Sequence, residues 1–521
     1  MSGGASVTVV ASRNALGEIW LGVVRPRSGV FARISTPHPG HPGPRVPLPD
    51  WPDGRQRLSK PAFRNRSRTR MGGAVRRSVG SERIQMEAVE QFLKENSITM
   101  VELATPDMTG ALRGKRIPVE SFLANGMSDG VGLSSAVLAW DYRMEVIETA
   151  DYSWSNGYPD IFLRPDVATL RLVPWKPKTA LVFCDVVDAA GELAAIAPRD
   201  VLRRVVADVE NAGLAPYIAM ETEFYALDGE SLRAPGDRNP VYSLHDNHYL
   251  EPFLDEICAM LLSADVEVEA CGAEYAPGQV EINLTPSDPV TAADSLLFFR
   301  YAVKQLAPRH GYRATFMAKP FGDLSGSGLH IHQSMWGKDK NNAFWDARTG
   351  GLSTVGGNYV AGLLKYAAEL QLVAVPTPNG YKRVTDHSFA PTNLSWGFDN
   401  RCAAVRVLIR EAKGTRVETR IAAADANPYL LAAAQLAAGA AGVTAGLAPA
   451  EPAANSYVSA EYPPLPTNIW AAATLFGESE FARRTLGAGT VQNLCQVARS
   501  EAAAGQREVT EWERARYLDS V

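Results

Sequence analysis

The chain has 521 residues, of which 46% are hydrophobic and 21% are charged. This is ordinary globular composition, and it excludes a wholly disordered, collagen-like or disulfide-framework protein. The net charge of −5 argues against a nucleic-acid binder that depends on overall positive charge.

The first 85 residues differ in charge from the rest of the chain. They hold 15 Lys and Arg against 4 Asp and Glu, whereas the remainder holds 37 against 53. Residues 26–70 are rich in Pro, Arg, Gly and Ser and show neither helical nor strand periodicity. We expect residues 1–85 to be a disordered basic extension, an Arg-rich targeting peptide, or sequence ahead of a true start at Met71 or Met86. The last of these is favoured over the extension.

Amphipathic helical sequence begins at Met86, and three β-like runs follow at 98–107, 168–174 and 179–188. A helix is predicted over 197–213, with Pro near its start and Gly at its end. We place a domain boundary near 191–198. The predicted domains are therefore 86–195 and 196–521, after the extension at 1–85.

The uncharged stretch from Asn427 to Ala450 is long enough to suggest a membrane span. It is mostly Ala and Gly, which favours a tightly packed core helix instead. The five cysteines form no C-x-x-C pair, so we expect a reducing, cytoplasmic location, no structural zinc and no membrane. No signal peptide opens the sequence.

Four predicted strands carry acidic, imidazole and guanidinium side chains in alternation, which places them on one face of each strand. A polar outer face in contact with water is the alternative, but such faces usually mix in Lys and Thr. The aligned residues are Glu221 and Glu223; Gln279, Glu281 and Asn283, with Glu274 upstream; His330, His332 and Ser334; and Arg416, Glu418 and Arg420.

Five carboxylates and a histidine in these strands favour a metal site. Carboxylate oxygens with one imidazole suit Mg²⁺ or Mn²⁺ better than Zn²⁺. Two divalent ions would balance most of the negative charge. Arg401 and Arg406 would serve an anionic partner such as ATP, because guanidinium groups match phosphate oxygens. Spacing alone does not show that the strands are neighbours.

Seven segments in order resemble the glutamine synthetase superfamily, from about residue 86 to the C-terminus. They are METEFYAL, EYAPGQVEINL, ATFMAKPFGDLSGSGLHIHQS, NGYKRV, WGFDNRCAAVRV, RVETRIAAADANPYL and WERARYL. The resemblance implies an α+β fold: an N-terminal β-grasp domain, then a catalytic domain with an antiparallel sheet. It also implies a homo-oligomer, a dodecamer of two hexameric rings, with sites between adjacent subunits.

The resemblance also assigns roles by position. Two or three Mg²⁺ or Mn²⁺ ions would be held by Glu223, Glu274 and Glu281 and by Glu221, His330 and Glu418. Arg401 and Arg406 would neutralise the transferred phosphate. His332, Ser334 and Arg416 would contact ATP. Arg383, Gly326 and Arg420 would surround glutamate.

The sequence departs from the ammonia-using members at two positions of one subsite. Gly132 stands where they carry an Asp that binds ammonium, and Phe389 stands where they carry a Glu. Glycine and phenylalanine offer space and apolar surface, whereas a small cation needs carboxylates nearby. Asp386 and His387 are the nearest replacements for a proton acceptor, or else plain surface-turn residues.

The prediction is an ATP-dependent ligase that joins the γ-carboxylate of glutamate to an organic amine through γ-glutamyl phosphate. Polyamines, ethanolamine, alkylamines and aromatic amines all remain candidates. Two alternatives stay open: glutamine synthetase using ammonia, and a catalytically silent structural member of the superfamily. The retained metal ligands argue against the second.

Overall fold

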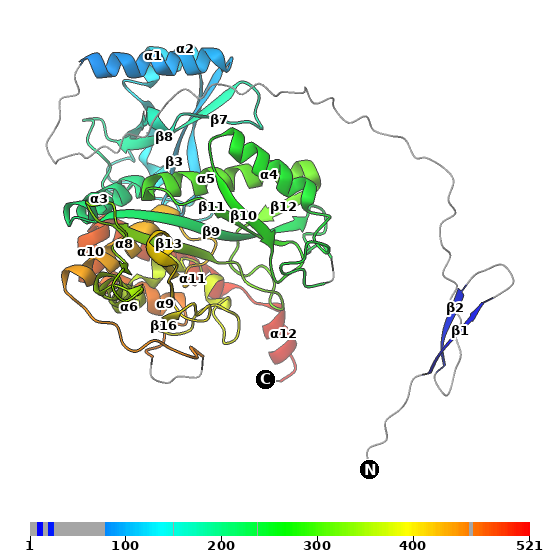
Figure 1. Ribbon diagram of the computed structural model, residues 1–521. Coiled ribbons are helices and arrows are strands. Elements are labelled where there is room, and N and C mark those ends of the chain that lie inside the picture. Colours follow the sequence, from blue (N-terminus) through cyan, green and yellow to red (C-terminus); the bar gives the residue numbers. More distant parts are fainter. Residues whose placement is uncertain are drawn as a thin grey trace, which may run out of the picture. The chain divides into compact units, whose positions relative to one another are not determined.

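The structure is a computed structural model that describes residues 8–13, 19–24, 79–149, 151–236, 238–457 and 462–520 (Figure 1). The chain divides into two compact units, 1–76 and 77–521. In the first unit, β1 (Thr8–Arg13) and β2 (Ile19–Val24) pair antiparallel. These strands were not expected, because the Pro- and Arg-rich composition that follows them dominated the prediction for this region. The stretch 26–70 lies outside the described residues.

The second unit begins with α1 (Val79–Glu95), seven residues before the predicted start at Met86. The preceding residues include Ser, Glu and Arg, which lengthen a helix without extending its apolar pattern, so periodicity alone missed them. Val89 and Leu93 of α1 are buried in the core of the sheet that follows.

That first sheet has six strands in the order β4-β3-β8-β6-β5, with β7 beside β8. β3 and β8 run parallel, and the other neighbours are antiparallel. The strands are β3 (Met100–Pro106), β4 (Leu112–Pro118), β5 (Val131–Ser134), β6 (Asp160–Pro165), β7 (Arg171–Leu172) and β8 (Thr179–Val187). The three predicted β-like runs correspond to β3, β7 and β8. The β-grasp assignment and the boundary near 191–198, which falls between β8 and the next helix, stay predictions.

The larger sheet has eight strands in the order β10-β11-β9-β13-β18-β17-β16, with β12 beside β9. They are β9 (Ala215–Asp228), β10 (Val268–Ala273), β11 (Gln279–Leu284), β12 (Tyr312–Thr315), β13 (Leu329–Trp336), β16 (Trp396–Phe398), β17 (Val405–Leu408) and β18 (Arg416–Thr419). The expectation of an antiparallel sheet is wrong at one edge, since β16 and β17 run parallel. Because β16 has only three residues, the loop 399–404 can carry the chain back to the end of the sheet where β16 begins, and β17 then runs in the same direction as β16.

Alternation along the strands separates the core from the polar face. On β9, Thr222 and Phe224 are fully buried, whereas Glu221 and Glu223 point to the opposite face. Figure 1 shows α5 alongside β9, on which it packs. The longer helices are α3 (Pro198–Asn211), α4 (Glu251–Ser263), α5 (Pro289–Leu306), α6 (Thr354–Ala374), α8 (Pro428–Thr444), α9 (Ile469–Glu478) and α11 (Ala488–Arg507). Four shorter helices are α2 (Val119–Ser121), α7 (Glu411–Gly414), α10 (Glu480–Leu486) and α12 (Glu511–Tyr517), and β14 (Trp345–Asp346) pairs with β15 (Gly351–Leu352).

The Ala- and Gly-rich stretch forms α8, the one helix among the described residues that is long and apolar enough to cross a membrane. It is a core helix that packs against α6 and α3. A Cβ atom on Gly442 would lie 2.2 Å from the carbonyl oxygen of Asn358, and one on Gly362 would lie 2.3 Å from that of Ala438. Glycine at these positions lets the two helix backbones touch, which explains the composition.

A buried guanidinium joins the two sheets of the second unit. Arg199, at the start of α3, pairs with Asp294 of α5 at 2.9 Å, with Asp166 after β6 at 3.0 Å, and with Asp185 of β8. Tyr429 of α8 donates a hydrogen bond to Asp294 at 2.6 Å. The Arg199 side chain is almost fully buried, so three carboxylates meet at one buried cation. The half-buried Arg203 also pairs with Asp166 at 2.5 Å and with Asp185 at 3.4 Å, whereas Asp294 has Arg199 as its cation.

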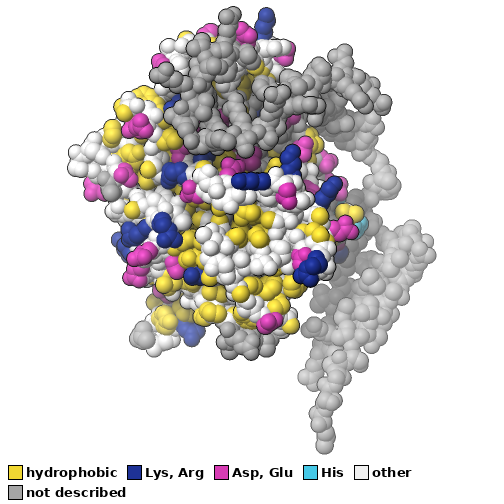
Figure 2. Space-filling model, turned by 60° about the vertical axis from the view of Figure 1, so that its left-hand side comes forward, with side chains coloured by type: hydrophobic (Ala, Val, Ile, Leu, Met, Phe, Trp, Pro, Cys, Tyr) yellow, Lys and Arg dark blue, Asp and Glu magenta, His cyan; other side chains and the backbone are white. Residues whose placement is uncertain are grey.

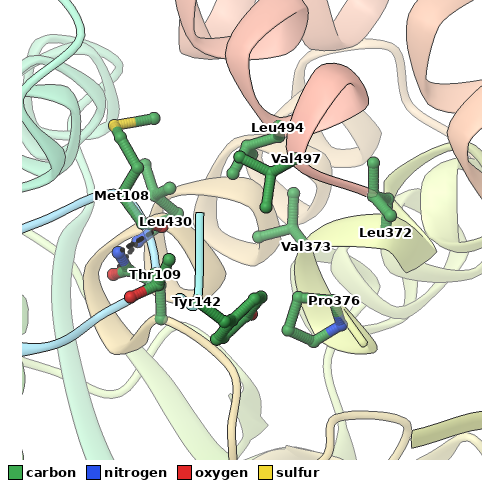
Figure 3. Close-up of a pocket in the computed structure, with 10 residues that line it drawn as sticks. Met108, Thr109, Tyr142, Leu372, Val373, Pro376, Leu430, Leu494 and Val497 are labelled. Atoms are coloured by element: carbon green, nitrogen blue, oxygen red, sulfur yellow. Dashed lines mark hydrogen bonds between the residues drawn. The ribbon is translucent and has the colours of Figure 1, made fainter. Parts of the chain in front are cut away.

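Nearby, a small cavity of about 20 Å³ lies between the loop after β3 and helices α6, α8 and α11 (Figure 3). Nonpolar side chains such as Met108, Val373 and Leu494 dominate its lining. A volume of that size holds about one water molecule and no substrate. The functional site therefore lies elsewhere, on the polar face of the larger sheet.

We predict that Arg199→Met lowers the free energy of unfolding by about 3–5 kcal/mol, because it leaves the buried Asp294 without its cation and removes one of the two arginines that pair with Asp166 and Asp185. Arg204→Met is the matched control, since Arg204 is exposed and donates only to the carbonyl of Ala195 at 2.8 Å. Urea unfolding followed by fluorescence measures both. A loss below about 1 kcal/mol for Arg199→Met, no larger than for the control, would contradict this account of the contact between the sheets.

Candidate active site

The larger sheet brings together the four strands that carry the predicted polar side chains. Their spacing in the sequence did not show that they are neighbours. Glu221 on β9 lies opposite His330 on β13 and Asn283 on β11. Glu223 lies opposite Glu281, and Glu418 lies between His332 and Arg406. Directly opposite side chains on one face are close enough to interact. The sheet register therefore assembles the predicted cluster.

Glu221, His330 and Glu418 form the tightest group, with one potential ligand atom from each within 4.8 Å of the others. His330 Nδ1 lies 2.8 Å from Glu221 Oε1 and 3.7 Å from Glu418 Oε1. His330 Nε2 is buried without a hydrogen-bond partner. Two carboxylates and an imidazole with an unused nitrogen fit a divalent cation.

Glu223, Glu274 and Glu281 form a second acidic group beside the first. Glu223 Oε2 accepts hydrogen bonds from the Gly328 amide at 2.9 Å and from Gln279 Nε2 at 3.2 Å. Burial, then repulsion by Glu221 and Glu223, raises the pKa of Glu281 to about 9. Burial and the charge of Glu223 raise the pKa of Glu274 to about 7. Bound cations would relieve this excess of negative charge.

The pKa values of Glu221 and Glu418 are lowered, unlike those of Glu274 and Glu281. Burial favours their neutral forms, but hydrogen bonds from His330 and His332 outweigh it and lower the pKa of Glu221. Burial of Glu418 is likewise outweighed by Arg420, so its pKa is also lowered. Both groups are therefore carboxylates at neutral pH, the form that a metal ligand needs.

Two of the predicted phosphate and glutamate arginines contact Glu418, which is only 1% exposed. Arg406 Nη1 donates to Glu418 Oε2 at 2.9 Å, and Arg420 pairs with Oε1. Asp399 also binds Arg406, through Nε at 3.0 Å, and Arg410 at 3.2 Å. Sequence reasoning missed Asp399, although its place two residues before Arg401 is a signal that could have found it.

The predicted nucleotide residues form a chain on β13 and β18. His332 Nε2 lies 3.2 Å from Glu221 Oε2, and Arg416 Nε donates to His332 Nδ1 at 3.2 Å. Because Nδ1 accepts, the proton of neutral His332 is on Nε2 and points to Glu221. Ser334 accepts a hydrogen bond from Trp336 Nε1 at 3.1 Å. These residues thus continue the strand face that carries the metal ligands.

Arg383 is buried beside the cluster, where it donates to the carbonyl of Ile421 at 3.2 Å. Gly326 gives it room: a Cβ atom there would lie 2.6 Å from Arg383 Cγ. Gly328 has the same role: a Cβ atom there would lie 2.7 Å from Arg383 Nη2 and 2.9 Å from His330 Nε2. Any side chain at 326 or 328 would displace the arginine or the imidazole.

The segment that follows Arg383 carries the residues expected at the amine subsite. His387 and Phe389 have positive φ angles of 63° and 58°. The Phe389 ring lies 5.8 Å from that of Tyr275, and the His387 ring lies 5.1 Å from that of Tyr457. Sequence reasoning missed Tyr275, which directly follows Glu274.

Three predicted site residues lie apart from these contacts. Asp386 accepts a hydrogen bond from Thr392 at 3.2 Å and is exposed. Arg401 is exposed as well, and its charge opposes the raised pKa of Glu274. Gly132 lies on β5 in the other sheet, opposite Phe162, so within one chain it is not a strand neighbour of the acidic cluster.

The family described as glutamine synthetase, catalytic domain, matches residues 195–517. The chain belongs to the glutamine synthetase family. A glutamate–isopropylamine ligase of a Pseudomonas species is 36% identical over 452 residues, 84% of this chain and 98% of the relative. A γ-glutamylethanolamide synthetase of Streptomyces coelicolor is 34% identical over 447 residues, 84% and 96% of the two chains.

A solved structure is also similar to this chain over most of its length. The complex of GmaS with ADP superposes with a TM-score of 0.74 and 31% identity, over 82% of this chain and 99% of that one. The acidic face of the larger sheet therefore lies within the part of the chain that matches the catalytic domain of this family.

We predict that metal-stripped protein loses stability as pH rises from the ordinary glutamate pKa of 4.5 through 7 to 9, because the folded state then holds protons that the unfolded state has lost. Mn²⁺ should stabilise the protein more at pH 8.5 than at pH 6.5, since it needs ionised ligands. Melting temperatures with and without Mn²⁺ measure both trends.

In Glu281→Gln, the decline of melting temperature with pH should be shallower and the stabilisation by Mn²⁺ should fall. Glu251→Gln, an exposed carboxyl on α4, is the control and should change neither. Equal stabilisation of wild type and Glu281→Gln by Mn²⁺ would exclude Glu281 as a ligand.

Proposed function

We propose that this protein uses ATP to join the γ-carboxylate of glutamate to the nitrogen of an organic amine, through γ-glutamyl phosphate. The observation that carries the proposal is a difference between two parts of the site. The residues expected to bind metal and phosphate lie together on one sheet face, whereas the subsite expected to hold ammonium presents Phe389. One similar enzyme is named for ligating isopropylamine and another for forming γ-glutamylethanolamide, which supports an organic nucleophile.

In the first step a γ-carboxylate oxygen of glutamate attacks the terminal phosphorus of ATP, and ADP leaves. We assign Arg383 to the α-carboxylate, with Gly326 beside the ammonium group, and Arg420 to the γ-phosphoryl group. Arg401 and Arg406 would neutralise the transferred phosphate. In the structure Arg406 and Arg420 are held on Glu418, so their guanidinium groups are already oriented before substrate arrives.

His332, Ser334 and Arg416 are assigned to the nucleotide, because they extend the same strand face beyond Glu221. The six ligands of the two acidic groups would hold two or three Mg²⁺ or Mn²⁺ ions. When bound, such ions offset the charge of the phosphoryl group in transfer.

In the second step the amine binds as an ammonium ion, loses one proton and then attacks the γ-carbonyl carbon with its neutral nitrogen. The C–N bond forms, the C–O bond to phosphate breaks, and the departing phosphate can take the second proton that the nitrogen loses. His387 is the better placed acceptor of the first proton, because it lines a cavity beside Phe389. Asp386 is bound to Thr392 instead.

The assembly is proposed as a homo-oligomer, a dodecamer of two hexameric rings. Gly132 would then line the site of the adjacent subunit, which explains why it lies apart from the acidic cluster in its own chain. Figure 2 shows hydrophobic side chains gathered over the middle and lower part of one face, among scattered charges, as subunit contact would require. All five cysteines are free thiols, which agrees with a cytoplasmic location.

Glutamate- and ATP-dependent phosphate release should be faster with an organic amine than with ammonia by at least about tenfold in kcat/KM, or about 1.4 kcal/mol. A panel of methylamine, ethanolamine, alkylamines, aromatic amines, diamines and ammonium measures this. Ammonia as the best nucleophile would restore glutamine synthetase as the function. No release with any amine or with ammonia would leave the silent structural alternative.

We predict that His387→Gln lowers kcat/KM for the amine by about tenfold or more, and most strongly below the pKa of the amine, because deprotonation then limits attack. Asp386→Asn, its neighbour in the same loop, should cost less than about threefold. The KM for glutamate should change little in either variant. A larger loss in Asp386→Asn than in His387→Gln would reverse the two assignments.

A further inference from the structure

A cavity of about 380 Å³ lies beside the segment that follows Arg383. Its size is within the range of pockets that take small organic molecules. The residues that line it are His387, Phe389, Asn400, Cys402, Ala454, Asn455, Ser456 and Tyr457. His387, the proposed proton acceptor, is one of these residues, so the cavity adjoins the place where the amine reacts.

Part of the cavity wall is connected to the acidic cluster through Arg401 and Arg420. Asn400 and Cys402 flank Arg401 in the chain, and the carbonyl of Arg401 accepts a hydrogen bond from Arg420 Nε at 2.8 Å. Arg420 in turn pairs with the buried Glu418. A molecule that reacts at the acyl phosphate and extends away from it would therefore enter the cavity.

Two aromatic rings in contact connect the cavity with a residue next to the acidic cluster. Phe389 lines the cavity, and its ring packs at 33° on Tyr275, the residue after Glu274. The two residues are 42% and 43% exposed, so both rings keep free apolar surface. Burying that surface against a substrate is favourable, and it is unavailable to ammonia.

The charge of the lining decides which substituent fits. None of the described residues that line the cavity is Asp or Glu. A second ammonium group, as in a polyamine, would be partly desolvated there, with neutral acceptors such as Asn400 and Asn455 and no carboxylate partner among the described lining residues. The free energy gained from the attraction of a cation to an exposed aromatic ring is much smaller than the free energy lost by desolvating that cation.

We infer that the cavity and the Phe389–Tyr275 ring pair form a specificity site for the apolar alkyl or aryl substituent of a primary monoamine, and that this site rejects polyamines. The inference rests on the proposed ligase function and narrows its amine to one chemical class. The amine nitrogen lies at the acyl phosphate, while its hydrocarbon part packs on the rings and fills the cavity.

The test compares n-pentylamine with 1,4-diaminobutane, which have the same number of non-hydrogen atoms and differ by one terminal ammonium group. Phosphate release and γ-glutamyl product are measured with the full chain, ATP, glutamate and Mg²⁺. We expect kcat/KM for n-pentylamine to exceed that for the diamine by at least about tenfold.

Phe389→Ala and Tyr275→Ala should each lower the ratio of kcat/KM for n-pentylamine to kcat/KM for methylamine by about tenfold. Phe389→Tyr, which keeps a ring, should restore most of the preference, and it keeps the test valid should the alanine variant fold poorly. Trp512→Ala is the control, since Trp512 belongs to another exposed ring pair, with Tyr517 at 5.8 Å on α12. It should leave the ratio of n-pentylamine to methylamine unchanged.

The outcomes separate the two levels of the proposal. A diamine that equals or exceeds n-pentylamine, or an unchanged ratio in Phe389→Ala and Tyr275→Ala, overturns the specificity site and leaves the ligase function standing. Turnover with ammonia alone removes the ligase function itself. A preference for n-pentylamine that both alanine variants abolish confirms the site.

Discussion

The whole site depends on a concentration of negative charge that is buried on one face of a sheet. Five glutamates lie on or beside neighbouring strands, and Glu418 is almost fully buried among them. Such an arrangement is costly unless cations compensate it. The protein supplies Arg406, Arg420 and two imidazoles, which satisfy Glu221 and Glu418 but leave Glu274 and Glu281 with raised pKa values. The uncompensated charge at Glu274 and Glu281 agrees with the proposal that divalent ions bind to this cluster.

The same constraint explains the surroundings of the cluster. Gly326 and Gly328 lack side chains because Arg383 and His330 occupy that space, and Asp399 orients Arg406 from the other side. The amine subsite is the one part that departs from this dense polar network. Aromatic surface takes the place of a carboxylate there, so selection for the nucleophile is separated from the machinery that activates glutamate.

Sequence alternation predicted which residues share a face, since a strand repeats every two residues whatever lies beside it. It could not predict the strand order, because the pairing of Glu221 with His330 joins residues more than 100 positions apart. Asp399 and Tyr275 were missed for a related reason: an isolated Asp or Tyr has no periodic signal, and its role appears only when Arg406 or Phe389 packs against it. The parallel edge of β16 was likewise invisible, since three residues are too few to carry a pattern.

The ion cluster at Arg199 has a consequence for motion. Asp166 and Asp185 belong to the smaller sheet and Asp294 to a helix on the larger one, and all three are tied to one buried guanidinium. Opening a hinge between the sheets would expose these charged groups together, so the ion cluster opposes a separation of the two sheets. A change of shape in the second unit is therefore less costly in segments that this cluster does not hold, such as the exposed residues 385–389.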